Sequence, residues 1–143
     1  MEKIKKYIFS FKNLFISILL LSVSVFLLMI FDFGELGPMI FIFWILLALS
    51  GIGLIILTLK KKIIGKLRLF LLLLGYSSAG FLLGVVFHNM LYALGTLIGD
   101  VAILDILINI LGAAFFITAV IICPICQLIG IVGTLILWKK LPD

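Results

Sequence analysis

The stretch Leu69–His88, LFLLLLGYSSAGFLLGVVFH, contains no Lys, Arg, Asp or Glu over 20 residues. A helix of that length is about 30 Å long, which is the thickness of the hydrocarbon core of a bilayer. The whole 143-residue chain is similar in character, since 66% of its residues are apolar and 12% are charged. Soluble domains have about 45–50% apolar and about 25% charged residues, and a soluble fold this small could not bury so much apolar surface. The composition therefore predicts a membrane protein, and it excludes a secreted disulfide scaffold, a disordered chain and a nucleic-acid-binding module.

Four uncharged runs are long enough to cross a membrane as helices, since a crossing needs about 20 apolar residues. We predict an all-α fold: one domain over residues 1–143, with four transmembrane helices in a compact bundle. The third run continues to Gly99, so we expect its helix to end between His88 and Leu94, before a segment that lies in the outer interface. Pro124 should kink the fourth helix. The predicted spans are approximately 14–31, 39–59, 69–92 and 112–138, with the outer interfacial segment at 93–109.

The basic residues lie in three segments: before the first span, between the second and third spans, and after the fourth. The other two connections carry carboxylates and no Lys or Arg. Because cytoplasmic loops hold the excess of Lys and Arg, we predict a multi-pass protein of the cell membrane with both termini in the cytoplasm. The basic segments either anchor the chain to lipid headgroups or bind a specific acidic partner. They comprise Lys3, Lys5, Lys6 and Lys12, then Lys60, Lys61, Lys62, Lys66 and Arg68, then Lys139 and Lys140.

Small and polar residues recur at helical spacing in the third and fourth spans. Helices in lipid associate through close packing of such residues and through hydrogen bonds, so we expect the two stripes to face each other. Counted from the basic ends, Gln127 lies at nearly the same depth as Ser77, and it should hydrogen-bond Ser77, Ser78 or the backbone beside them. This cluster either stabilises the packing of the helices or lines a permeation path. The stripes are Ser77, Gly80, Gly84 and His88 in the third span, and Ala119, Cys123, Gln127, Gly130 and Thr134 in the fourth.

His88-Asn89, near the outer end of the third span, is the second candidate site. Imidazole is the side chain that titrates near neutral pH, and ionisable groups at membrane depth are functional candidates. His88 is therefore a helix-packing residue, a proton or ion relay, or a metal ligand that acts with the outer carboxylates. Those carboxylates are Asp32, Glu35, Asp100 and Asp105.

Cys123-Pro124-Ile125-Cys126 contains the only two cysteines of the chain. A CxxC pair is typical of thiol–disulfide exchange or of soft-metal binding; the alternative is two small packing residues that flank a kink. With its four spans, the chain resembles the vitamin K epoxide reductase and bacterial disulfide-bond-forming quinone reductase families in Cys123 and Cys126. Those families also use a second cysteine pair, which this chain lacks.

Two further runs resemble segments of small four-span membrane proteins of prokaryotes. They are Gly75–Phe81 with His88–Tyr92, and Phe115-Phe116 with Cys123–Ile125. The resemblance covers about a third of the chain and implies a four-span fold without an established activity.

Three functions stay open on the sequence. The first is a non-enzymatic interaction or accessory subunit, which would present a small-residue stripe such as Gly95–Gly99 or Gly51–Gly53 to a partner. The alternative is a small transporter or channel for an ion or solute, with a path along His88, Ser77 and Gln127. The lesser alternative is a thiol-redox protein that uses Cys123 and Cys126. We expect no catalytic residues, no cofactor and no nucleic acid; the expected partners are the lipid bilayer and either a second copy of the chain or another membrane protein.

Overall fold

The computed structural model describes residues 10–30, 37–98 and 102–140, and it is all-helical over these residues. Four helices are long and apolar enough to cross a membrane, within Phe11–Leu28, Ile40–Lys60, Gly65–Leu97 and Ile103–Ile136. The last of these is one continuous rod that contains a short segment of π-helix. In chain order the elements are α2 (Phe11–Ile30), α3 (Gly37–Lys60), α4 (Gly65–Ile98), α5 (Ala102–Ile117), η2 (Thr118–Ile122), α6 (Cys123–Ile136) and the 3₁₀ turn η3 (Trp138–Lys140).

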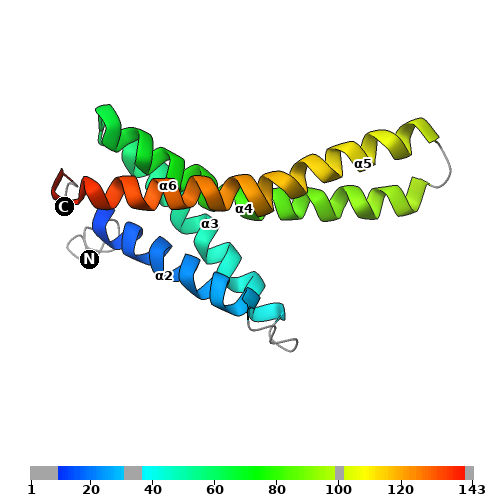
Figure 1. Ribbon diagram of the computed structural model, residues 1–143, viewed down its shortest axis with the longest axis horizontal. Coiled ribbons are helices and arrows are strands. Elements are labelled where there is room, and N and C mark those ends of the chain that lie inside the picture. The colour runs from blue at the N-terminus through cyan, green and yellow to red at the C-terminus, as the bar shows by residue number, and fades with distance from the viewer. Residues whose placement is uncertain (1–9, 31–36, 99–101, 141–143) are drawn as a thin grey trace.

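Helix α4 is the central element. It packs against α3 on one side and against the α5–η2–α6 rod on the other, while α2 packs on α3. Figure 1 shows the two hairpins, α2–α3 and α4–α6, crossing at an angle, with the outer part of the α4–α5 hairpin extending beyond α2 and α3. The predicted compact bundle is therefore formed only where the hairpins cross. Helix α4 extends beyond the crossing because it has 34 residues, whereas α2 has 20 and α3 has 24.

The apolar core lies at the end of the molecule where the start of α2 meets the end of α6 (Figure 1). Phe15 of α2 meets Trp138 edge-on, with the ring centroids 5.5 Å apart. This contact fixes the start of α2 beside the end of the last helix. The buried core residues are Phe11, Phe15, Ile18, Leu47, Leu54, Leu67, Leu71, Leu74 and Ile131.

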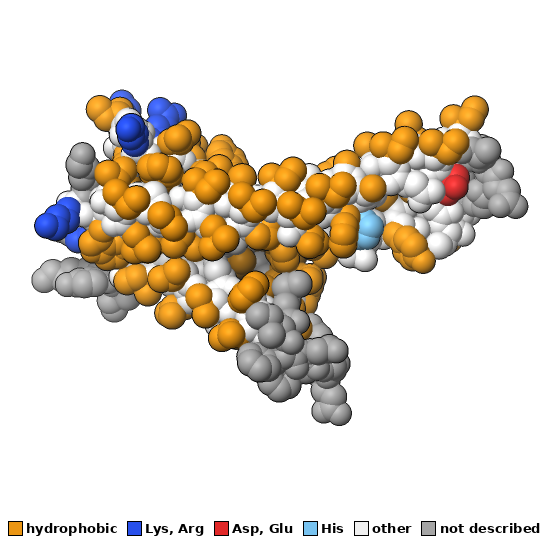
Figure 2. Space-filling model, in the orientation of Figure 1, with side chains coloured by type: hydrophobic (Ala, Val, Ile, Leu, Met, Phe, Trp, Pro, Cys, Tyr) orange, Lys and Arg blue, Asp and Glu red, His pale blue; other side chains and the backbone are white. Residues whose placement is uncertain are grey.

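Charge is separated along the long axis of the molecule. Figure 2 shows the described Lys and Arg side chains at one end and the described carboxylate, Asp105, at the other. The turn between α3 and α4 belongs to the basic end, and it is closed by Lys62 and Gly65 in left-handed conformations, with φ of 50° and 72°. The arrangement agrees with the topology predicted from the basic segments, and the side of the membrane that each end faces stays a prediction.

The predicted end of the third helix was wrong, and the location of residues 93–109 in the outer interface stays a prediction. Helix α4 continues past His88 and Leu94 to Ile98, and α5 begins at Ala102, so residues 93–98 and 102–109 are regular helix. No proline interrupts residues 69–98, and a single glycine costs a helix only about 1 kcal/mol. Nothing in the local sequence therefore ends the helix about 20 residues after Leu69.

Candidate functional site

Small residues of α4 pack directly against the α5–η2–α6 rod, as the two stripes predicted. A Cβ added to Gly80 would lie 3.2 Å from the Cys123 Sγ, and one added to Gly84 would lie 2.8 Å from the Ala119 Cβ. Toward the basic end, a Cβ on Gly130 would lie 2.9 Å from the backbone of Leu74. Only glycine allows the helices to approach this closely.

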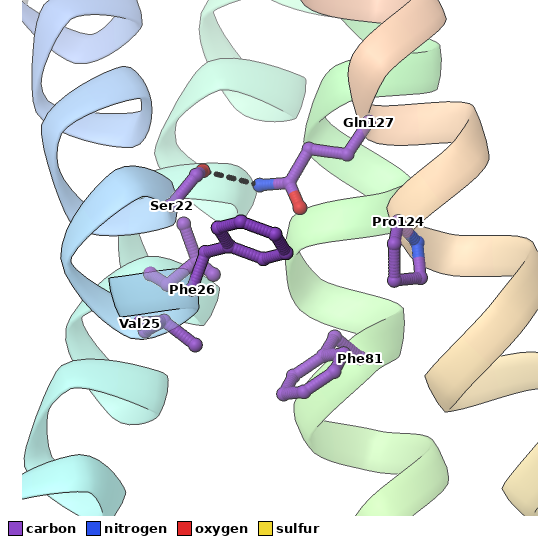
Figure 3. Close-up of a pocket in the computed structure, with 7 residues that line it drawn as sticks. Ser22, Val25, Phe26, Phe81, Pro124 and Gln127 are labelled. Atoms are coloured by element: carbon purple, nitrogen blue, oxygen red, sulfur yellow. Dashed lines mark hydrogen bonds between the residues drawn. The ribbon is translucent and has the colours of Figure 1, made fainter. Parts of the chain in front are cut away.

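Gln127 joins three helices. Its side-chain Nε2 donates to the Ser22 Oγ of α2 at 2.7 Å (Figure 3). The same Nε2 donates to the Ser78 Oγ of α4 at 3.2 Å. The predicted bond to Ser78 is confirmed. Ser77 is also buried, but its hydroxyl donates to the Leu74 carbonyl of its own helix. Sequence reasoning missed Ser22, because it is a single hydroxyl among apolar neighbours on its face of α2 and belongs to no stripe.

The hydroxyls that accept from Gln127 pass their own protons to backbone carbonyls. Ser22 donates to the Ile18 carbonyl and Ser78 to the Leu74 carbonyl. The amide protons of Gln127 and both hydroxyl protons therefore have acceptors, which is the arrangement that stabilises helix association in lipid.

A pocket of about 100 Å³ lies beside Gln127, where the two hairpins diverge. A water molecule takes about 30 Å³ and drug-sized ligands need about 300 Å³ or more, so the pocket has room for a few waters. Of the predicted route along His88, Ser77 and Gln127, only Gln127 lines this pocket. The lining residues, all but one of which are labelled in Figure 3, are Ser22, Val25, Phe26, Leu47, Phe81, Pro124 and Gln127.

His88 bridges α4 and α5. Its Nδ1 lies 2.9 Å from the Gly112 carbonyl oxygen, and its ring centroid lies 5.1 Å from that of Phe116. A carbonyl oxygen can only accept, so Nδ1 carries the proton of this bond. Asn89 does not share this site, because its Nδ2 donates to the Val85 carbonyl of its own helix and its side chain is exposed.

Of the four outer carboxylates, the structure describes Asp105, and this residue does not lie beside His88. Asp105 precedes Gly112, the bonding partner of His88, by seven residues, so it lies about 10 Å further out along α5. Asp32, Glu35 and Asp100 are outside the described residues. Within residues 10–30, 37–98 and 102–140, no group of three or more His, Cys, Asp or Glu side chains could hold a metal ion.

Both cysteines are free thiols, with Cys123 buried against Gly80 and Cys126 half-buried. Redox-active CxxC pairs have a thiolate that is stabilised by a free helix N-terminus. Here the helix is continuous through η2, and the Cys123 N–H donates to the Thr118 carbonyl. The geometry around Cys123 is that of a packing residue.

Pro124 explains the π-helical segment that precedes it. Proline has no N–H to donate to the carbonyl four residues back, and its ring crowds that carbonyl. The backbone accommodates the proline by forming the wide turn Thr118–Ile122. In this turn the Cys123 N–H donates to the carbonyl of Thr118, five residues back. The rod changes direction between α6 and α5 (Figure 1), as predicted from Pro124.

The small-residue stripes that the interaction hypothesis needed at the surface are internal. A Cβ on Gly51 would lie 2.7 Å from the Gly75 carbonyl oxygen of α4, and one on Gly53 would lie 3.6 Å from the Leu14 side chain of α2. A Cβ on Gly95 would face Ile108 of α5 at 3.4 Å. Gly51, Gly53 and Gly95 thus face other helices of this chain; Gly99 is outside the described residues.

No protein-family model, no curated protein and no solved structure matches this chain. Its function is therefore inferred from the geometry of these sites.

Proposed function

We propose that this chain is a non-enzymatic interaction protein of the cell membrane, in which the outer part of the α4–α5 hairpin binds a helix of another membrane protein or of a second copy. The observation that carries the proposal is the reach of that hairpin beyond α2 and α3 (Figure 1). At 34 residues, α4 is about 51 Å long, against about 30 Å for α2 and about 36 Å for α3.

The surplus length is apolar. On α5, a set of large side chains recurs at helical spacing on the face opposite α4, and we call it the α5 stripe. Its outermost member, Ile103, is 81% exposed. Inside the hydrocarbon core, lipid covers an apolar side chain as well as a partner would. Helix α4 is longer than the core, which is about 30 Å thick, so the outermost members of the stripe lie beyond it and gain from cover by another apolar surface. The α5 stripe comprises Ile103, Leu107, Ile110 and Ile117.

The proposal does not extend to transport or to thiol chemistry. His88 and Gln127 each hydrogen-bond a neighbouring helix, which supports helix packing, and Ser77 bonds the Leu74 carbonyl of its own helix. Cys123 lacks the free helix terminus of a redox centre.

Photo-crosslinking in native membranes tests the proposal. A photoreactive residue in place of Ile103 or Ile110 should give a discrete protein adduct, whose mass distinguishes a second copy from another protein. The matched control is Ile52 on α3, an exposed apolar residue that should give lipid adducts only. Lipid adducts alone at all three positions would contradict the proposal.

A further inference from the structure

A groove of about 290 Å³ lies between the outer parts of α4 and α5, on the side away from the α5 stripe. Its volume is close to the lower end for small-molecule sites, which is about 300 Å³. His88 follows Arg68 by 20 residues, so it lies about 30 Å from the basic end, at the expected outer edge of the hydrocarbon core. The lining residues are His88 and Tyr92 from α4 and Ile108, Asn109, Gly112, Ala113 and Phe116 from α5.

Three polar side-chain groups in the groove have no hydrogen-bond partner within the described chain. Because Nδ1 of His88 donates to the Gly112 carbonyl, Nε2 is the ring nitrogen left to accept a hydrogen bond in this tautomer. Within the described chain, neither Nε2 nor the Tyr92 hydroxyl nor the Asn109 amide makes a hydrogen bond to another residue. Nε2 lies at the expected edge of the hydrocarbon core and the other two groups lie one turn further out, so all three can bind one hydroxyl group that sits at this boundary.

Polarity changes along the groove. Tyr92 and Asn109 lie one helical turn further out than His88 and Gly112, and Phe116 lies one turn further in. No lining residue is Lys, Arg, Asp or Glu. The groove thus offers a neutral polar end toward the outer surface and an apolar end toward the hydrocarbon core.

We propose that this groove binds an amphiphile that presents a neutral hydroxyl group to His88 and lays its apolar part against Phe116. The hydroxyl donates to Nε2 of His88, and its oxygen accepts from Tyr92 or Asn109. Two membrane molecules have this chemistry: a lipid with a glycerol hydroxyl, and a hydroquinone with a tail. The site is independent of the partner-binding surface proposed above, because it occupies another face of α5.

The chain has one histidine, so the ¹⁵N resonances of its imidazole report on this groove alone. The full chain, without a histidine tag, is labelled and placed in phosphatidylcholine nanodiscs, which supply no free hydroxyl. Dioleoylglycerol and decylhydroquinone are added separately, each beside its O-methyl ether as the matched control. We expect Nδ1 to be protonated and the Nε2 resonance to shift saturably with one hydroxyl compound and not with its ether. The compound that acts identifies the source as lipid or quinol.

Variants separate the groove from unspecific partitioning. Tyr92→Phe removes only a hydroxyl, and it should weaken binding about 3- to 10-fold, the factor that one hydrogen bond carries. His88→Phe keeps an aromatic ring against Phe116 and should abolish saturable binding measured by native mass spectrometry. Asn89→Leu, the neighbour that bonds its own helix, should bind as the parent does. No Nε2 shift with either compound, an equal shift with the ethers, or unchanged binding by both groove variants would overturn the proposal.

Discussion

Gln127 hydrogen-bonds across from α6 to both α2 and α4. Replacing it with Leu removes both bonds, while Ser22 and Ser78 keep their backbone acceptors. Interhelical hydrogen bonds in lipid are worth about 0.6 kcal/mol each, so Gln127→Leu should lower the free energy of unfolding by about 1 kcal/mol. Steric trapping in bicelles measures this. Thr96→Val is the control, because that exposed hydroxyl bonds only within α4; equal stabilities for both variants would contradict this role for Gln127.

Gly84 tests the close approach of α4 to the rod. A Cβ at Gly84 would lie 2.8 Å from the Ala119 Cβ and 3.1 Å from the Phe115 carbonyl oxygen. Gly84→Ala should therefore cost about 1–3 kcal/mol of stability, as overpacking does. Gly53→Ala is the matched control, because its Cβ would meet Leu14 at an ordinary 3.6 Å; it should be neutral or stabilising, since Ala favours helix by about 1 kcal/mol over Gly. The same steric-trapping measurement compares the two, and a Gly84→Ala protein as stable as the parent would refute the contact.

The contacts of α4 with α6 could be predicted from the sequence because Gly80, Gly84 and Gln127 stand out against apolar neighbours. The partner Ser22 could not, since it is the single polar residue on its face of α2. The register of Gln127 with Ser78 came from counting residues from the basic ends, and it worked because both helices are regular over that distance.

At the scale of elements, Pro124 sets the geometry of the last rod. Pro124→Ala restores the N–H that an α-helix needs, so the π-helical turn at Thr118–Ile122 should shorten and shift α5 against α4. In a variant without the native cysteines, a Cys pair at Gly95 and Ile108 reports the register, since a Cβ on Gly95 would lie 3.4 Å from the Ile108 side chain. We expect this pair to form a disulfide efficiently with Pro124 and poorly with Ala. Equal yields would mean that packing, and not proline, holds the π-helical turn.

Element boundaries were the weakest part of the sequence analysis, and the cause is physical. Span length was predicted from bilayer thickness, but a helix ends where its own residues stop it. Residues 69–98 contain no such stop, and α4 continues well beyond one perpendicular crossing. The wide turn before Pro124 could have been expected as a kink but not as a π-helix, because proline permits several local adjustments.

At the scale of the whole molecule, the account rests on a chain that crosses the bilayer four times with its basic segments on one side. The fold brings the described Lys and Arg side chains to one end, opposite Asp105 (Figure 2). The partner-binding surface and the groove at His88 both lie in the outer half only if this topology holds.

Cysteine accessibility in intact cells tests that topology most directly. In a chain with Cys123 and Cys126 replaced by Ser, Lys61→Cys and Asp105→Cys are each treated with a membrane-impermeant maleimide. The account predicts that Asp105→Cys is labelled from outside and that Lys61→Cys is labelled only after the membrane is permeabilised. Labelling of both positions from the same side of the intact membrane would contradict it.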